Sequence, residues 1–182
     1  MAVPAVVLTE YTAEDEATLR QWWQDEAIRK YLGPLATVLQ DPLERTAMSG
    51  GRIARPTLRW MAHDQSTGVC VGYVSVQVTG QSGPDGKASP VGPPFHGGVN
   101  IVVDPRRQGS GFGTAVLRVL FEQPALSDVA TLGGSVDVTN VGSLGMLRRL
   151  DLAGEDPEKR RDGTTFQPFT IPGPATGKNT HI

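Results

Sequence analysis

A glycine-rich segment in the middle of the chain has the residue types and spacing of an anion-binding loop. In residues 99–114, VNIVVDPRRQGSGFGT, an apolar run ends at Asp104, two arginines follow, and Gly109, Gly111 and Gly113 alternate. The first amides of a helix have no intrahelical partner, and the helix dipole adds partial positive charge beside them. Glycines let a ligand approach the backbone closely. The pattern therefore predicts a loop that binds an anionic group such as phosphate.

The spacing of these glycines excludes the two common nucleotide-binding loops. A P-loop needs a lysine directly after its last glycine, and none follows here. A dinucleotide-binding loop needs a third glycine where this chain has Thr114, and an acidic residue about 20 residues later in a fitting context. On these grounds a strand-to-helix turn that holds no ligand stays open as an alternative.

The loop requires a strand before it and a helix after it. Residues 99–103 are apolar except Asn100, and residues 114–122 have the spacing of an amphipathic helix. Pro168 predicts an edge position for the last strand, over residues 164–171. Further strands are expected at residues 6–10, 58–63, 69–79 and 134–139, and helices at residues 12–32, 42–48 and 143–152. The order predicts an α+β sheet with at least two crossover helices.

The composition indicates one packed domain. The chain has 182 residues, 38% hydrophobic and 20% charged, which suits a single core over residues 1–171. Glycine and proline concentrate in residues 80–98, where we expect a long mobile loop between two strands. Residues 172–182 are expected to form a disordered tail. The single cysteine, Cys70, excludes an intramolecular disulfide.

The same composition disfavours several partners and locations. The formal net charge is −2, so no overall attraction to nucleic acid or an anionic membrane is expected. No apolar run approaches the roughly 20 residues of a membrane span, and the N-terminus lacks the basic region of a signal peptide. Three scattered histidines and one cysteine do not form a zinc pattern. We therefore expect a soluble cytoplasmic protein without a metal.

The loop and a second segment together resemble the GNAT superfamily of N-acetyltransferases. The family pattern is [RQ]-x-x-G-x-[GA] after a strand that ends in a hydrophobic-x-Pro step, and Gln108, Gly111 and Gly113 match it. Residues 140–154, NVGSLGMLRRLDLAG, are similar to the family's N-x-x-[SA] and the helix that follows it. Residues 19–33, LRQWWQDEAIRKYLG, are similar to the subgroup of ribosomal-protein N-terminal acetyltransferases and aminoglycoside 6'-acetyltransferases.

This resemblance implies a fold and a co-substrate. The expected fold is a GNAT-like mixed, mostly antiparallel splayed sheet flanked by helices, and the acyl donor is acetyl-CoA. The pantetheine arm would pair with the backbone of Ile101, Val102 and Val103. Asn140 would hydrogen-bond that arm or, alternatively, only close the turn before its helix. The other cofactor-binding residues implied by the match are Gln108, Gly109, Ser110, Gly111, Phe112, Gly113 and Thr114.

The implied reaction moves the acetyl group to a primary amine by direct attack in a ternary complex. Many family members carry a tyrosine seven residues after the motif asparagine, as the acid for the departing thiolate, and this chain has Leu147 there. Leucine cannot donate a proton, although a thiolate is a good leaving group without an acid. The alternative is therefore a non-catalytic acyl-CoA-binding or sensing module.

The base that the amine requires is also open. Some relatives use a glutamate five residues before the asparagine, where this chain has Ser135. Asp137 lies two residues further, on the same strand face, and is the first candidate base, with a capping role as the alternative. His96 is the second candidate. Tyr31, at helical spacing with the tryptophans of the first helix, could pack in the core or form a wall of the acceptor pocket.

The acceptor is expected to be a small-molecule or peptide amine, without nucleic acid or membrane as partner. A polycationic acceptor would need an acidic pocket, and the acidic residues of the first helix are either that pocket or a solvated face. A homodimer is common in such folds, and the sequence leaves the oligomeric state open.

Overall fold

The molecule is built on a single mixed sheet. The computed structural model describes residues 3–40, 47–48, 52–81, 92–152 and 156–177. The strands are β1 (Val6–Glu10), β2 (Ala47–Met48), β3 (Arg52–Ala54), β4 (Leu58–Asp64), β5 (Cys70–Gln81), β6 (Gly92–Val103), β7 (Val129–Asp137), β8 (Glu158–Lys159) and β9 (Thr165–Pro172). Their order is β1-β4-β5-β6-β7-β9-β8, with β3 pairing β2 and β5. Only the β6–β7 pair is parallel among the described strands. The predicted mixed, mostly antiparallel sheet is confirmed.

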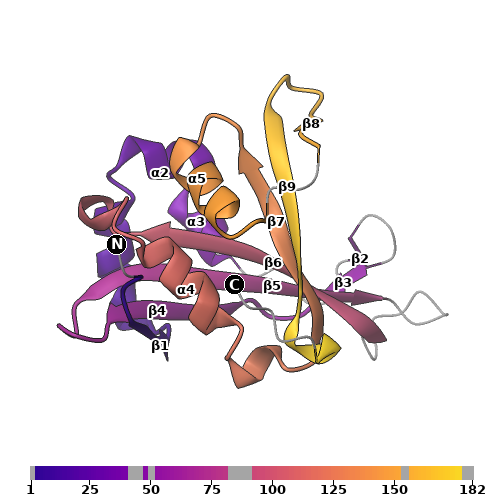
Figure 1. Cartoon of the computed structure of the whole chain (residues 1–182), viewed down its shortest axis with the longest axis horizontal. Helices are drawn as coiled ribbons and strands as arrows, with labels where there is room; N and C mark the ends of the chain where they lie inside the picture. Colours follow the sequence, from indigo (N-terminus) through magenta and orange to yellow (C-terminus); the bar gives the residue numbers. More distant parts are fainter. Residues whose placement is uncertain (1–2, 41–46, 49–51, 82–91, 153–155, 178–182) are drawn as a thin grey trace.

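Helices occupy the segments before and between these strands (Figure 1). They are α1 (Glu16–Trp22), α2 (Glu26–Leu32), α3 (Leu35–Leu39), α4 (Phe112–Leu120) and α5 (Val141–Arg149). The single helix predicted over residues 12–32 is divided because Asp25 caps α2, its carboxylate accepting from the amides of Ala27 and Ile28. The helix predicted over residues 42–48 is wrong at its end, where Ala47–Met48 form β2; residues 42–46 lie outside the described residues.

Two apolar cores lie on opposite faces of the sheet. In the larger core, α4 buries Leu117 and Leu120 among side chains of the strands, such as Val76 and Leu132. The second core joins α1 and α2 to the sheet and consists of Leu19, Trp22, Trp23, Ile28, Met61, Tyr73 and Val102. Because alternate side chains of a strand point to opposite faces, β6 contributes Val102 to the second core and its two neighbours to the first.

The sheet opens where β6 and β7 part. They pair in parallel only from Phe95 with Val129 to Gly98 with Gly133. Beyond Gly98, β6 continues to Val103 along β5, while β7 continues to Asp137 along β9. Figure 1 shows β7 and β9 turning away from β5 and β6, with α5 in the angle between them. The implied splay is present, and it begins directly after Gly98 pairs with Gly133.

The loop predicted over residues 80–98 is wrong at both ends, since Gly80 and Gln81 belong to β5 and residues 92–98 to β6. Glycine suggested a loop, but a Cβ on Gly97 would meet Leu132 Cδ2 at 2.4 Å and Val76 Cγ1 at 2.7 Å. The strand therefore uses glycine for close packing. Its two prolines fall where the β5–β6 register shifts, so the ladder loses little there. Residues 82–91 lie outside the described residues.

The tail predicted over residues 172–182 also needs a correction at its start. Pro172 ends β9, and Pro174–Thr176 form a short 3-10 turn. The Gly173 amide donates to the carbonyl of Ala130 at 2.7 Å, which ties this turn to β7. Ordered structure thus extends past residue 172, and residues 178–182 lie outside the described part of the chain.

Candidate functional site

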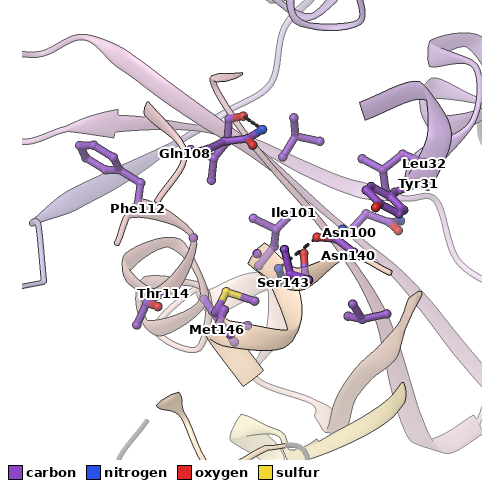
Figure 2. A pocket seen from close by; sticks show the side chains of 18 of the residues that line it. Tyr31, Leu32, Asn100, Ile101, Gln108, Phe112, Thr114, Asn140, Ser143 and Met146 are labelled. Atoms are coloured by element: carbon purple, nitrogen blue, oxygen red, sulfur yellow. Dashed lines mark hydrogen bonds between the residues drawn. The ribbon is translucent and has the colours of Figure 1, made fainter. Parts of the chain in front are cut away.

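A cavity of about 380 Å³ occupies the angle between the two diverging strands. This volume suits a small-molecule ligand. Its walls come from α2, the C-terminal half of β6, the glycine loop with the start of α4, the C-terminal end of β7, and α5. Figure 2 shows Ile101, Asn140 and Ser143 at its centre, with Tyr31 and Asn100 to one side and Gln108 and Phe112 to the other.

The glycine loop forms one end of the cavity. Gly111 has φ +89°, in the left-handed region, and is the residue from which α4 begins. The first intrahelical bond runs from the Ala115 amide to the Gly111 carbonyl at 3.1 Å, so the preceding amides have no intrahelical partner. Gln108 donates from Nε2 to the Val103 carbonyl at 3.4 Å and folds the loop back onto β6. The loop has the geometry of an anion site, as its sequence predicts.

Asp104 stabilises the turn that leads into this loop. Its carboxylate accepts from the backbone amide of Arg106 at 3.0 Å and from the Arg106 guanidinium at 3.1 and 2.9 Å, while its side chain is 2% exposed. Burial alone would raise the pKa of Asp104, but the hydrogen bonds from Arg106 and the charges of Arg106 and Arg107 lower it overall. Asp104 thus caps the 3-10 turn at Pro105–Arg107.

Asp104 should therefore contribute to the acid sensitivity of the fold. Because its folded-state pKa is lowered, its stabilising contribution is present above the unfolded pKa near about 4 and is lost as the pH falls through the lower folded value. We expect Asp104→Asn to lower the free energy of unfolding at about pH 7 and to lose much of that difference at about pH 2.5. Urea titrations at both pH values measure this, and a difference independent of pH would contradict it.

Asn140 fixes the start of α5 on the opposite wall. Its side-chain oxygen accepts from the Ser143 amide at 3.1 Å, which is an N-cap hydrogen bond. The capping role is therefore present, and the side-chain amide group of Asn140 also faces the cavity. From α5, Gly142, Met146 and Arg149 line the same wall at helical spacing.

Substitutions at Asn140 should separate capping from any other role. Asn140→Ala removes the cap and should lower the free energy of unfolding by about 1 kcal/mol. Asn140→Asp retains a good capping oxygen, and it should leave that free energy nearly unchanged. Thermal or urea unfolding of the two variants measures the effect. An equal loss in both would show that the cap is not what Asn140 contributes to stability.

Asp137 lies at the cavity but is engaged in a turn. Its Oδ1 accepts from the Thr139 amide and from the Thr139 hydroxyl, both at 2.7 Å. The backbone hydrogen bond first, then the hydroxyl and the charge of Lys30, lower the pKa of Asp137. A carboxylate with a lowered pKa is a weak base. The capping alternative for Asp137 is thus present, and the residue keeps a negative charge at the cavity wall.

His96 is not at the site. It lies within β6, not in a loop, and its Nδ1 is 2.6 Å from the Thr131 hydroxyl of β7. Five residues separate it from Ile101 along an extended strand, a distance of roughly 16 Å. It is absent from the cavity lining among the described residues. The prediction of His96 as a base is therefore corrected, because the strand continues beyond the expected loop and carries this side chain away.

Leu147 lies in the core, whereas Tyr31 lies at the cavity. Leu147 is fully buried in the larger core. Tyr31, for which a core position and a pocket wall were both open, lines the cavity from α2. Its hydroxyl donates to the Thr139 carbonyl at 3.0 Å and so connects α2 to the β7–α5 turn across the opening. Tyr31 therefore borders the cavity on the face of the second core.

Comparison with known proteins agrees with this geometry. The family model described as an acetyltransferase (GNAT) domain matches residues 5–153. The chain belongs to the GNAT acetyltransferase family. A comparison with curated proteins gave no match.

Solved structures of other acetyltransferases share the fold at low sequence identity. The aminoglycoside acetyltransferase AAC(6')-Ib, solved with coenzyme A and kanamycin, is 19% identical with a TM-score of 0.64, over 96% of this chain and 99% of that one. An aminoglycoside N(6')-acetyltransferase from Legionella pneumophila is 12% identical with a TM-score of 0.64, over 94% of both chains. The spermidine N-acetyltransferase from Vibrio cholerae, solved with CoA and spermine, is 11% identical with a TM-score of 0.62, over 95% and 98%.

Most of the predicted binding residues do meet at the cavity. Those that line it are Ile101, Val102, Val103, Gln108, Gly109, Gly111, Phe112, Gly113, Thr114, Asn140 and Asp137. Ser110 is exposed and outside the lining among the described residues. The sequence analysis named neither Met146, Arg149 and Phe166 nor Ser143, the last residue of its N-x-x-[SA] match, as binding residues, and all four line the cavity. The GNAT match would have found Ser143, Met146 and Arg149, because they repeat at helical spacing after Asn140.

Neither a metal cluster nor a membrane span occurs in the described segments. No group of three or more His, Cys, Asp or Glu side chains there is placed to hold a metal ion. None of the helices in those segments has the length and apolar character needed to cross a membrane.

Proposed function

We propose that this protein is an N-acetyltransferase that moves an acetyl group from acetyl-CoA to a primary amine by direct attack in a ternary complex. The observation that carries the proposal is the free edge of β6. From Val99 to Val103, the backbone of β6 faces the cavity directly beside the glycine loop, and no described strand pairs with it on the β7 side. Unpaired amide and carbonyl groups of a strand edge bind an extended chain that carries its own amides.

The donor would lie between this edge and α5. Its pantetheine amides would pair with Ile101 and Val103, and its pyrophosphate would accept from the amides of residues 109–114 at the start of α4. Arg107 and Arg149 also line the cavity, and their charges favour an anionic ligand. Asn140 has one side-chain oxygen in its cap and an amino group left to donate to the pantetheine arm.

The amine would approach from the face of β6 and β7 that carries Asn100, Ser135 and Asp137. Holding amine and thioester in one cavity contributes much of the rate, since the reaction becomes effectively unimolecular. The lowered pKa of Asp137 suits it to attract an ammonium group, with water taking the proton before attack. With Leu147 buried in the core, solvent protonates the departing thiolate.

The solved relatives support an amine as acceptor. AAC(6')-Ib was solved with coenzyme A and kanamycin, and the Vibrio cholerae enzyme with CoA and spermine. Both ligands carry primary amines, and both structures have the fold of this chain. The relatives support the reaction class, while the acceptor of this protein depends on its own side chains.

Two measurements test the proposal. Calorimetry should detect binding of acetyl-CoA and of CoA to the full chain, and thiol release should rise above the rate of spontaneous hydrolysis when primary amines are added. Absence of CoA binding at millimolar ligand would overturn the proposal. Binding without thiol release for any amine in a broad panel would instead favour a non-catalytic acyl-CoA-binding or sensing module.

A further inference from the structure

One face of the β7–β9 pair adjoins the amine side of the cavity. Ser135 and Asp137 of β7 pair with Pro168 and Phe166 of β9, so these four side chains share a face. Ser135, Asp137 and Phe166 all line the cavity. The opposite face of the same strands carries Leu132 and other residues of the larger core. The Ser135–Phe166 face is therefore the outer wall that an acceptor would contact.

Arg160, from the turn between β8 and β9, is exposed and not part of the cavity lining, but it packs against two residues of this wall. Its Cζ lies 3.9 Å from the centroid of the Phe166 ring, a stacked cation–π contact. Its Nη2 donates to the Ser135 hydroxyl at 3.4 Å. The turn is held because the Arg160 amide donates to the Thr164 carbonyl at 2.8 Å. Stacking fixes the plane of the guanidinium and leaves further N–H donors for an anionic group.

Asp137 supplies the opposite charge on the same wall. Both of its hydrogen bonds with Thr139 use Oδ1, so Oδ2 is available to an ammonium group. Asp137 and Ser135 are two residues apart on one strand, roughly 6–7 Å. Asp137 pairs with Phe166 across the two strands, so its carboxylate and the guanidinium stacked on Phe166 occupy neighbouring positions of the wall. No ion pair joins them in the described part of the chain. Glu158 lies one strand further out, opposite Phe166.

Two opposite charges at neighbouring positions suit a small zwitterion. In an α-amino acid the amine and carboxylate are separated by about 2–3 Å, and each charge-assisted hydrogen bond adds about 2.8 Å. An α-amino acid can therefore reach two opposite charges that are up to about 8 Å apart. A polycation, by contrast, would bring a second positive group against Arg160, which is unfavourable at short range.

We propose that Arg160, stacked on Phe166, binds a carboxylate of the acceptor while Asp137 binds its amine, so that the acceptor class is a small amino acid-like zwitterion. The inference rests on the proposed acetyltransferase function and names its substrate class. The Arg160 guanidinium serves as a specificity determinant, because it contacts the part of the acceptor that does not react.

Matched pairs of acceptors test this assignment. Phenylalanine with phenethylamine, lysine with cadaverine, and glutamate with 4-aminobutyrate each differ by the carboxylate next to the amine. We expect at least one amino acid to bind the CoA-loaded protein about tenfold more tightly than its partner amine, measured by calorimetry. Arg160→Gln should abolish that preference, and Arg160→Lys should restore part of it. Arg161→Gln, which makes the same charge change at the next residue, should leave the preference intact.

The outcomes separate a failure of the zwitterion assignment from a failure of the proposed acetyltransferase function. Equal or weaker binding of every amino acid than of its amine would overturn the zwitterion assignment while leaving the acetyltransferase function in place. A preference that survives Arg160→Gln would overturn the role of Arg160. Failure of CoA itself to bind the wild-type protein would instead overturn the proposed function. CoA binding and thermal unfolding of the Arg160 variants serve as the check that each is folded.

Discussion

Replacing Gly111 with valine is expected to weaken acetyl-CoA binding by at least about tenfold. The residue has φ +89°, and a Cβ at this position would lie 3.1 Å from Pro4 Cδ, so a branched side chain is strained there and presses on the N-terminal segment. Relief of that strain moves the amides that begin α4, which are the groups proposed to bind the pyrophosphate. Calorimetry of the variant with acetyl-CoA measures the loss.

A second glycine provides the matched control for backbone strain. Gly68, in the turn between β4 and β5, has φ +69°, and a Cβ there would meet nothing within 4 Å. Gly68→Val should therefore cost stability through the same unfavourable dihedral but leave the affinity for acetyl-CoA unchanged. Equal affinity losses in both variants would show that strain acts through the whole fold, and unchanged affinity in Gly111→Val would remove the loop from the binding site.

Replacing Gly97 with alanine is expected to lower the free energy of unfolding by about 1–3 kcal/mol. The added methyl would overlap the side chains of Leu132 and Val76, which lie in the larger core at the point where β6 and β7 part. A loss of 1 kcal/mol corresponds to a fall in Tm of roughly 2–4 °C in a domain of this size. Thermal and urea unfolding of the variant measure the change.

The neighbouring glycine controls for the loss of backbone freedom. A Cβ on Gly98 would lie 3.9 Å from the Gln77 carbonyl, an ordinary contact on the other face of the strand. Gly98→Ala should therefore be neutral or slightly stabilising, because alanine restricts the unfolded chain more than glycine does. Destabilisation of both variants to the same extent would refute close packing as the reason for Gly97.

The features that were predicted best depend on residues close together in the sequence. The spacing of Gln108, Gly111 and Gly113 located the loop, and the cap at Asn140 located the start of α5, because both features are local in the chain. The strands β4 and β5 were also found nearly to their ends, whereas only parts of β6 and β7 were found, because glycines interrupt both strands. Periodicity was sufficient wherever a strand or helix buries one continuous face.

The features that sequence could not supply depend on contacts between distant segments. Gly97 looks like a loop residue until Leu132 and Val76 are seen beside it. His96 looks like a site residue until β6 is seen to extend through it, and Tyr31 has no local signal for its bond to Thr139. Phe166 and Arg160 meet Ser135 only because β9 pairs with β7. Such positions follow from tertiary pairing, which local patterns do not encode.

The short β6–β7 pairing has a consequence for how the protein unfolds. Among the described strands, pairing joins one half of the sheet, β1 to β6, to the other, β7 to β9, only between residues 95–98 and 129–133. A ligand in the cavity would contact both halves and add a second connection between them. Amide hydrogen exchange in β7 and β9 should therefore slow when acetyl-CoA is added, as expected when a ligand binds the folded state and not the locally unfolded one. Bound acetyl-CoA would therefore connect the two halves of the sheet across the cavity.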